Sequence, residues 1–222
     1  MSVLQNPALE QILAALHTRS DAQVADIERY YKAAGKDAAS PDEIKAFRGD
    51  KLVALDRDKA EFCHLLCRAN DARCIVEVGT SYGVSTLYLA AAIHDNISVT
   101  GGDGIVIATE YEPAKVAAAR ANFKQAGLSH LIDLREGDLR ETLQHIDGPI
   151  DFVLVDIWIA MARPALELVA PHLRPGSLVV CDNTERHRDD YASYFAFLHD
   201  PANRFRTMTL PFDGGLELSV RC

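Results

Sequence analysis

The sequence predicts an α/β fold: a doubly wound, mostly parallel seven-stranded sheet with a C-terminal antiparallel hairpin, preceded by N-terminal helices. After residue 51, short continuous apolar runs alternate with helical segments, as in parallel strands covered by helices on both faces. The last two apolar runs flank a Gly-rich turn, which indicates the hairpin. At 222 residues, the chain can bury a full core without disulfides or metals.

The first elements are helical. Apolar residues recur at helical spacing over residues 7–17 and 22–34, and Gly35 and Ser40 then interrupt the pattern. A third helix is predicted over 58–70. These patterns divide the chain into two parts. The domains that we predict are a helical extension, 1–50, and a main domain, 51–222.

Five β-α units follow. The apolar runs predicted as strands are 74–78, 104–110, 131–135, 150–156 and 177–182. The helices predicted after them are 84–93, 113–126, 139–145, 162–172 and 189–199. The hairpin strands lie within 204–212 and 216–221, and residues 97–102 are predicted as a loop before the second strand. The resulting sheet is Rossmann-like, but the hairpin distinguishes it from a plain dinucleotide-binding fold.

Composition excludes several classes of protein. The net charge is -9 and the basic residues are scattered, which argues against a nucleic-acid partner or an anionic membrane surface. No apolar run approaches the roughly 20 residues of a membrane span, and residues 1–19 lack the apolar core of a signal peptide. The five cysteines include no CxxC pair, so we interpret them as small buried hydrophobes in a reducing compartment. These features predict a cytoplasmic protein.

A glycine-rich loop follows the strand 74–78. Gly79 and Gly83 allow the backbone to turn sharply, and the N-terminus of the next helix offers free N–H groups to an anionic group. The alternative is an ordinary turn in a β-α unit. Glu110, at the end of the second strand, can accept both hydroxyls of a ribose. It lies farther from the loop than the ~20 residues of a dinucleotide fingerprint, and Ser81 replaces the middle glycine, so NAD is disfavoured.

Two further groups extend this candidate site. Asp138 follows the third strand, where it could lie near an adenine amino group or cap the next helix. Asp156 and the pair Asp182-Asn183 close the fourth and fifth strands, whose carboxyl ends share one edge of the sheet. Two carboxylates and an amide oxygen suit Mg²⁺, although carboxylates at such positions are also common helix caps.

From about residue 51 to residue 221, the sequence resembles the cation-dependent small-molecule O-methyltransferases, which include the catechol and caffeoyl-CoA types. The resemblance implies that the E-x-G-x-x-x-G-x-S pattern holds S-adenosylmethionine, with Ser85 on its methionyl carboxylate. The cofactor-binding residues that it implies are Leu55, Glu77, Gly79, Thr80, Ser85, Glu110, Asp138, Asp156 and Trp158. The family's metal ligands fall on Asp156, Asp182 and Asn183, and Asp156 is also implied in catalysis.

One position departs from the family pattern. Catechol-type members have a lysine that acts as general base after the tryptophan, and this chain has Ile159 after Trp158. Trp158 is expected to form an aromatic wall beside the cofactor and substrate, or simply to pack. His187, four residues beyond Asn183, is a candidate replacement base because an imidazole suits proton abstraction near neutral pH. A solvated loop histidine is the alternative.

We therefore predict a Mg²⁺-assisted O-methyltransferase that acts on a small phenolic or catechol-like molecule and forms a homodimer through its N-terminal helices. Three alternatives stay open at this point. They are a metal-independent methyltransferase of the same fold, a non-catalytic S-adenosylmethionine-binding protein that lost turnover with the lysine, and an NAD-dependent oxidoreductase.

Overall fold

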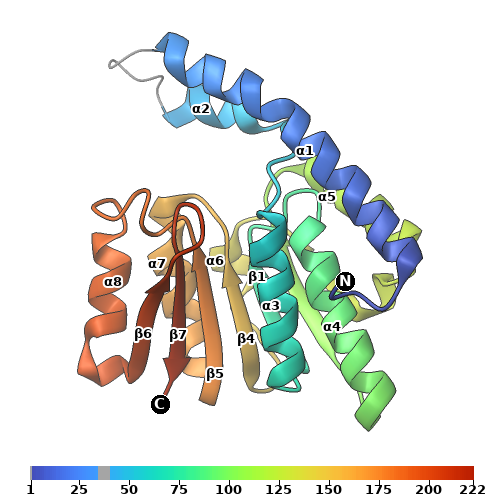
Figure 1. Cartoon of the computed structure of the whole chain (residues 1–222). Coiled ribbons are helices and arrows are strands. Elements are labelled where there is room, and N and C mark those ends of the chain that lie inside the picture. Colours follow the sequence, from blue (N-terminus) through green and yellow to red (C-terminus); the bar gives the residue numbers. More distant parts are fainter. Residues whose placement is uncertain (1, 35–40) are drawn as a thin grey trace.

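The computed structural model describes residues 2–34 and 41–222, which form a seven-stranded sheet with helices on both faces (Figure 1). The strands are β1 (Cys74–Val78), β2 (Ile105–Glu110), β3 (Ile132–Glu136), β4 (Ile150–Val155), β5 (Leu173–Asp182), β6 (Phe205–Leu210) and β7 (Leu216–Arg221). Their order is β3-β2-β1-β4-β5-β7-β6; β1 to β5 run parallel, and β7 is antiparallel to β5 and β6. The predicted doubly wound sheet with an antiparallel hairpin is therefore confirmed.

Helices and short 3₁₀ turns connect the strands. The helices are α1 (Pro7–Ala34), α2 (Pro41–Arg48), α3 (Arg57–Ala69), α4 (Val84–Thr100), α5 (Pro113–Gln125), α6 (Leu139–Thr142), α7 (Ile159–Val169) and α8 (Ala192–His199). The 3₁₀ turns are η1 (Ser129–Leu131), η2 (Ala170–His172) and η3 (Pro201–Asn203). None of the helices described is both long and apolar enough to cross a membrane.

The sheet separates two apolar cores. Alternate residues of each central strand point to opposite faces, so Ile75 joins the core beneath α3, α4 and α5, whereas Val76 joins the core beneath α6, α7 and α8. Both residues are fully buried. Because every central strand is covered on both faces, its sequence is mostly apolar, which is why these strands could be located from their continuous apolar runs.

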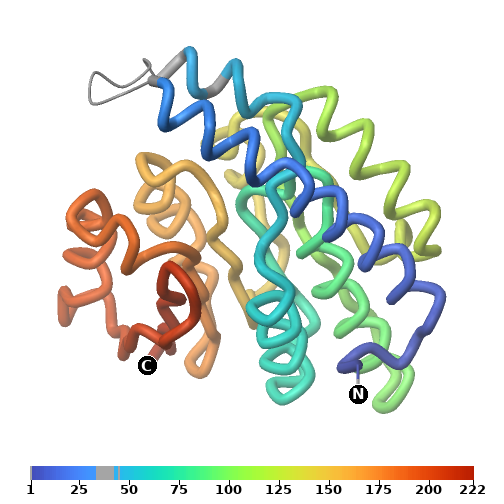
Figure 2. Tube along the Cα trace, turned by 45° about the horizontal axis from the view of Figure 1, so that its top comes forward, coloured from blue at the N-terminus to red at the C-terminus, as the bar shows by residue number. Residues whose placement is uncertain are grey.

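The N-terminal helices differ from the rest in how they pack. Leu9, Leu13 and Leu16 in the first half of α1 are buried in the core shared with α3 and α4. The second half of α1 continues past the sheet beside α2, above the carboxyl ends of the parallel strands (Figures 1 and 2). Tyr30 of α1 stacks on Phe47 of α2, with ring centres 3.8 Å apart. The boundary near residue 50 stays a prediction, and the predicted break at Gly35 and Ser40 lies outside the described residues.

The loop predicted over residues 97–102 is largely wrong, because α4 continues to Thr100 and ends at Gly101. Arg73, from the segment before β1, explains the extension. Its guanidinium donates a hydrogen bond to the carbonyl of Gly101 at 2.8 Å and also bonds Thr100, so it satisfies carbonyl and hydroxyl groups at the helix end. The β-branched residues Ile97, Val99 and Thr100 would otherwise disfavour a helix.

Candidate functional site

The turn after β1 approaches the end of β4 so closely that only glycine fits at its first position. Gly79 has φ +98°, and a Cβ added there would lie 2.0 Å from the backbone oxygen of Asp156. The N–H of Asp156 in turn donates to the carbonyl of Val78 at 3.0 Å. The glycine of the sequence motif therefore brings the β1 turn and Asp156 into direct contact.

Glu77 lies beneath this turn with no exposed surface. Its Oε2 accepts hydrogen bonds from the hydroxyls of Thr80, at 2.9 Å, and Thr86. Its Oε1 is buried and accepts no hydrogen bond from the described residues. Burial raises the pKa of Glu77, although the surrounding hydroxyls oppose that shift. Glu77 thus fixes the turn from below and keeps one acceptor oxygen available.

Glu110 holds the other side of the turn. Its Oε2 accepts from the N–H of Ser81 at 2.7 Å, and its Oε1 accepts from the N–H groups of Tyr111 and Glu112, each at 2.9 Å. The hydroxyl oxygen of Ser81 is buried with no hydrogen-bond partner among the described residues. Glu110 therefore organises the loops around β1 and β2, and its Oε2, which accepts one hydrogen bond where Oε1 accepts two, can still accept a further one.

Asp138 caps α6, as one of its two predicted interpretations requires. Its carboxylate accepts from the backbone N–H of Arg140 at 2.9 Å and also pairs with the guanidinium of Arg140. These hydrogen bonds lower the pKa of Asp138 to about 2. The predicted contact with adenine uses the same carboxylate and stays a prediction.

A shallow cavity brings several predicted cofactor residues together. Leu55 and Asp156 line it along with Gly79, Thr80 and Ser85 of the β1 turn and the start of α4. Leu55 comes from the extended segment between α2 and α3, so three separate parts of the chain meet here. Glu77, Glu110, Asp138 and Trp158 do not line this cavity. The cavity thus joins the glycine turn after β1, which we call the loop side of the site, to Asp156, which belongs to its acidic side.

The acidic side is formed by the ends of β4 and β5. Asp182 is 5% exposed, and its Oδ2 accepts from Nδ2 of Asn183 at 2.6 Å. Part of Asp156 is exposed, yet partial burial and the charges of Asp182 and Glu77 raise the pKa of its carboxyl to about 8. Burial likewise raises the pKa of Asp182, against the effect of a neighbouring ammonium. The two aspartates therefore lie close enough to oppose each other's ionisation.

That ammonium belongs to Lys59 of α3, which the sequence analysis missed. Lys59 is 1% exposed, and its Nζ donates to Asp182 Oδ1 at 2.7 Å and to Asp56 Oδ2 at 2.9 Å. Burial lowers the pKa of Lys59, but these two carboxylates outweigh burial and raise it above its usual value. The spacing was a usable signal, because Lys59, Cys63 and Cys67 recur every four residues on the buried face of α3.

Trp158 lies at the mouth of the acidic site and is 46% exposed. The guanidinium carbon of Arg48, the last residue of α2, lies 5.5 Å from the centre of its ring, within the range of a cation–π contact. Ile159, which occupies the position of the family lysine, begins α7 and packs against the core formed with α6, α7 and α8. It contributes no titratable group.

His187 lies in the turn between β5 and α8, and about half of its side chain is exposed. Its Nδ1 lies 3.8 Å from a carboxylate oxygen of Asp190, and its carbonyl accepts from the N–H of Tyr191 at 3.1 Å. None of its contacts with the described residues reaches Asp156 or Asp182. The structure does not bring this predicted base into the acidic site.

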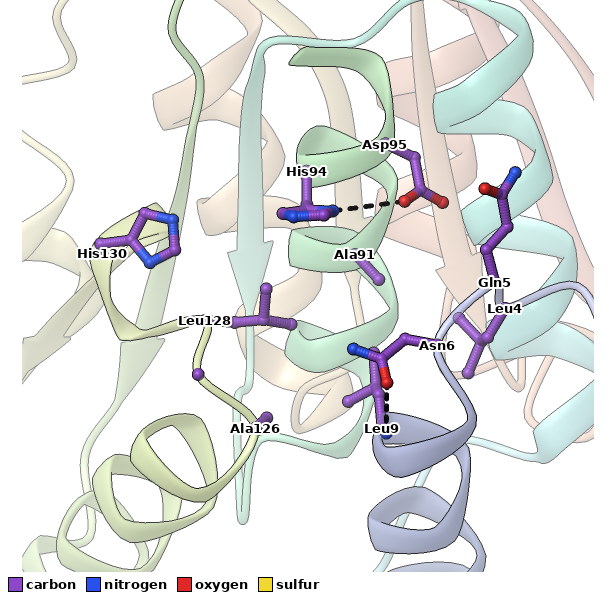
Figure 3. Close-up of a pocket in the computed structure, with 11 residues that line it drawn as sticks. Leu4, Gln5, Asn6, Leu9, Ala91, His94, Asp95, Ala126, Leu128 and His130 are labelled. Carbon is purple, nitrogen blue, oxygen red and sulfur yellow. Dashed lines mark hydrogen bonds and ion pairs between the residues drawn. The ribbon is translucent and has the colours of Figure 1, made fainter. Parts of the chain in front are cut away.

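A larger cavity of about 190 Å³ lies elsewhere, between the start of α1, α4 and the turn after α5 (Figure 3). Leu4, Leu9 and Leu128 contribute its apolar wall, and His94 and His130 lie at its rim. None of the residues predicted for cofactor or metal lines it. We therefore place the candidate site at the carboxyl edge of the sheet, around β1, β4 and β5.

Comparisons with known proteins find related sequences and structures. Residues 76–184 match a family described as a methyltransferase domain, a span that runs from β1 past Asn183. A catechol O-methyltransferase of Niastella koreensis is 29% identical over 142 residues, which cover 62% of this chain and 61% of that protein. A catechol O-methyltransferase of Mycobacterium tuberculosis is 31% identical over 139 residues, which cover 60% of this chain and 58% of that protein.

A caffeoyl-CoA O-methyltransferase of Petroselinum crispum is 28% identical over 152 residues, covering 64% of this chain and 58% of that protein. The matches thus span about three fifths of the length of these curated relatives. Among solved structures, a Bacillus cereus O-methyltransferase in complex with S-adenosylhomocysteine has a TM-score of 0.69 and 20% identity, covering 96% of this chain and 100% of that one. A Podospora anserina methyltransferase has a TM-score of 0.72 and 19% identity, and the match covers 100% of this chain and 90% of that one. These structures share the fold.

Proposed function

We propose that the chain, which is similar to catechol and caffeoyl-CoA O-methyltransferases, is an O-methyltransferase of that family and methylates a hydroxyl of a small, catechol-like aromatic acceptor. S-adenosylmethionine is the methyl donor, and a divalent cation, Mg²⁺ or a similar ion, assists. The observation that carries the proposal is charge. Glu77 and Asp156 contact the glycine turn, the charges of Glu77 and Asp182 act on Asp156, and the buried ammonium of Lys59 pairs with Asp182. Such a site favours ligands that bring positive charge.

The cofactor fits the loop side. Its methionyl part is proposed to lie in the cavity formed by Leu55, Gly79, Thr80, Ser85 and Asp156. The unpaired Oε1 of Glu77 supports this, because a buried acceptor without a donor is costly and an ammonium group nearby would offset that cost. Glu110 would accept a ribose hydroxyl with the remaining lone pair of its Oε2. Asp138 is proposed for the adenine end, and Trp158 for the side wall.

The donor set at the acidic side fits a hard divalent cation. Asp156, Asp182 and Asn183 would hold it with two carboxylates and one amide oxygen. Asn183 now directs Nδ2 at Asp182, so binding requires the amide to turn over. Among the described residues, no group of three or more His, Cys, Asp or Glu side chains gathers to form a metal site. When bound, the cofactor supplies a transferable methyl group and the cation lowers the pKa of the acceptor hydroxyl.

The chain's own contribution is then mainly alignment. Gly79 fixes Asp156 against the cofactor turn, and Lys59 holds Asp182 in place. Trp158 limits water at the mouth of the site. Positioning an oxygen nucleophile against a methyl donor in this way can supply much of the rate enhancement. A homodimer and a cytoplasmic location are part of the proposal.

Methyl transfer provides the direct test of cation dependence. We expect purified protein to methylate catechol from S-adenosylmethionine, and EDTA to lower the rate at least about tenfold because the hydroxyl's pKa is no longer lowered. Added Mg²⁺ should restore it. Product is measured by mass spectrometry, with S-adenosylhomocysteine binding measured in parallel as a control for folding. Full activity in EDTA would contradict the role proposed for the cation.

One observation favours metal-independent methyl transfer as a second candidate. Lys59 already neutralises Asp182 within hydrogen-bond distance, so the acidic pair is partly compensated by the chain itself. In that case Asp156 and Asp182 would contact the acceptor directly, without a cation between them. The EDTA experiment separates the two candidates. Cofactor binding without transfer to any catechol, flavonoid or phenolic acid would instead favour the non-catalytic alternative raised by Ile159.

The proton acceptor has its own prediction. If His187 is the base, replacing it with alanine should lower kcat about 100-fold and change the shape of the pH profile of turnover. His172→Ala, a change in the 3₁₀ turn η2 that follows α7, is the matched control. Unchanged turnover and an unchanged pH profile would exclude His187, in agreement with its exposed position in the turn.

A further inference from the structure

Arg48, the last residue of α2, has no carboxylate partner among the residues that the structure describes. Arg186 and Arg188, in the neighbouring β5–α8 turn, pair with carboxylates at 2.6 and 2.9 Å. No carboxylate in the described parts of the chain lies within ion-pair distance of Arg48, and its guanidinium carbon lies 5.5 Å from the centre of the Trp158 ring. An arginine in this position has hydrogen-bond donors available for a ligand.

A second cation lies close to the same place. Burial lowers the pKa of Lys115 on α5, and the positive charge of Arg48 adds to that effect, whereas Glu110 opposes it. Within residues 2–34 and 41–222, no carboxylate lies within 4 Å of the Lys115 ammonium either. Two neighbouring cations without ion pairs repel each other. An anionic group bound between or beside them would relieve that repulsion.

We propose that Arg48 binds a carboxylate on the methyl acceptor, so that the preferred substrates are aromatic acids with adjacent hydroxyls rather than neutral catechols. This inference rests on the proposed function. The aspartates define the hydroxyl end of the acceptor, and Trp158, two residues beyond Asp156, provides a flat surface for its ring. Arg48 covers that same surface from α2. A guanidinium matches a carboxylate with two parallel hydrogen bonds.

The helical extension thereby gains a role in substrate choice. Figure 1 shows α2, which ends at Arg48, above the carboxyl edge of the sheet, and the stacked pair Tyr30–Phe47 fixes α2 on α1. The carbonyl of Arg48 accepts from the N–H of Lys51 at 3.1 Å, which ends the helix at this point. The arginine is therefore presented from a packed element, although it lies far from the glycine turn in sequence.

The test compares 3,4-dihydroxybenzoate with its methyl ester, which differ by one negative charge. For Arg48→Met, we expect KM for the acid to rise about tenfold while KM for the ester changes less than about twofold, since only the acid loses an ion pair. For Arg48→Lys, we expect a KM for the acid between those of the wild-type protein and Arg48→Met. Lys51→Met is the matched control, because Lys51 pairs with Asp50 and should leave both KM values unchanged. Affinity for S-adenosylhomocysteine should be the same in all four proteins.

Two results would overturn the inference while the proposed function stands. One is a lower KM of the wild-type protein for the ester than for the acid, and the other is an equal rise in KM for acid and ester in Arg48→Met. A matching loss of S-adenosylhomocysteine affinity would place Arg48 on the cofactor instead. If neither compound is methylated, the proposed function fails. Calorimetric binding of acid and ester to the S-adenosylhomocysteine complex then still decides the role of Arg48, since it needs no turnover.

Discussion

Replacing Lys59 with methionine is expected to lower the free energy of unfolding by about 3–5 kcal/mol at about pH 8, the usual cost of breaking a buried ion pair. The side chain is 1% exposed and donates to Asp182 at 2.7 Å. Methionine keeps the length of the side chain and removes the charge. Asp182 would then lie buried beside Asp156 with only Asn183 donating to it.

The loss of unfolding free energy in Lys59→Met should depend on pH. Burial and neighbouring charges already raise the pKa values of Asp156 and Asp182, so both carboxyls take up protons more readily in the folded state than in the unfolded state. Without the ammonium, their pKa values rise further. The deficit of Lys59→Met should therefore shrink as the pH falls from about 8 to about 5.5, because the folded variant then binds protons that the unfolded chain does not.

Urea unfolding at both pH values, with and without MgCl₂, measures these effects. Mg²⁺ should also narrow the deficit, since it supplies charge at the same carboxylates. Lys51→Met is the control, because Lys51 pairs with the largely exposed Asp50 and should cost less than about 1 kcal/mol. If Lys59→Met loses the same free energy of unfolding at both pH values, with and without Mg²⁺, then Lys59 stabilises the fold through packing and not through its charge.

The location of the site could be predicted from the sequence because it depends on strand order. Asp156 and Asp182 each follow an apolar run, and parallel neighbouring strands place such residues at one edge. In the structure, β4 and β5 pair in register, with Val155 opposite Cys181, so both carboxylates emerge side by side. The turn at Gly79 could be predicted for a similar reason, since its chemistry is local.

The partners of these residues could not be predicted. Lys59 and Arg48 reach the site from α3 and α2. Helical spacing can place Lys59 on the buried face of α3, but no local pattern shows which carboxylate it meets there. The same limit applies to α4, whose last turn depends on Arg73, a residue that precedes β1. In each case, a long-range contact overrides a short-range preference.

Replacing Gly79 with alanine is expected to cost more than about 3 kcal/mol of unfolding free energy, because backbone strain and overpacking act together. The residue has φ +98°, which an L side chain rarely adopts. The added Cβ would lie 2.0 Å from the carbonyl oxygen of Asp156 and 2.8 Å from its carbonyl carbon. Both contacts are with backbone, so no flexible side chain can move to relieve them. The end of β4 must shift instead.

That shift changes the site as well as the stability. Moving Asp156 away from the β1 turn would separate the cofactor side of the cavity from the acidic side, so we also expect S-adenosylhomocysteine binding to weaken at least about tenfold. Gly127→Ala is the matched control: Gly127 has φ +71° with no atom within 4 Å of an added Cβ, and should cost only about 1 kcal/mol. Urea unfolding and calorimetry compare the two variants. Equal losses would show that positive φ alone, and not contact with Asp156, makes glycine necessary at position 79.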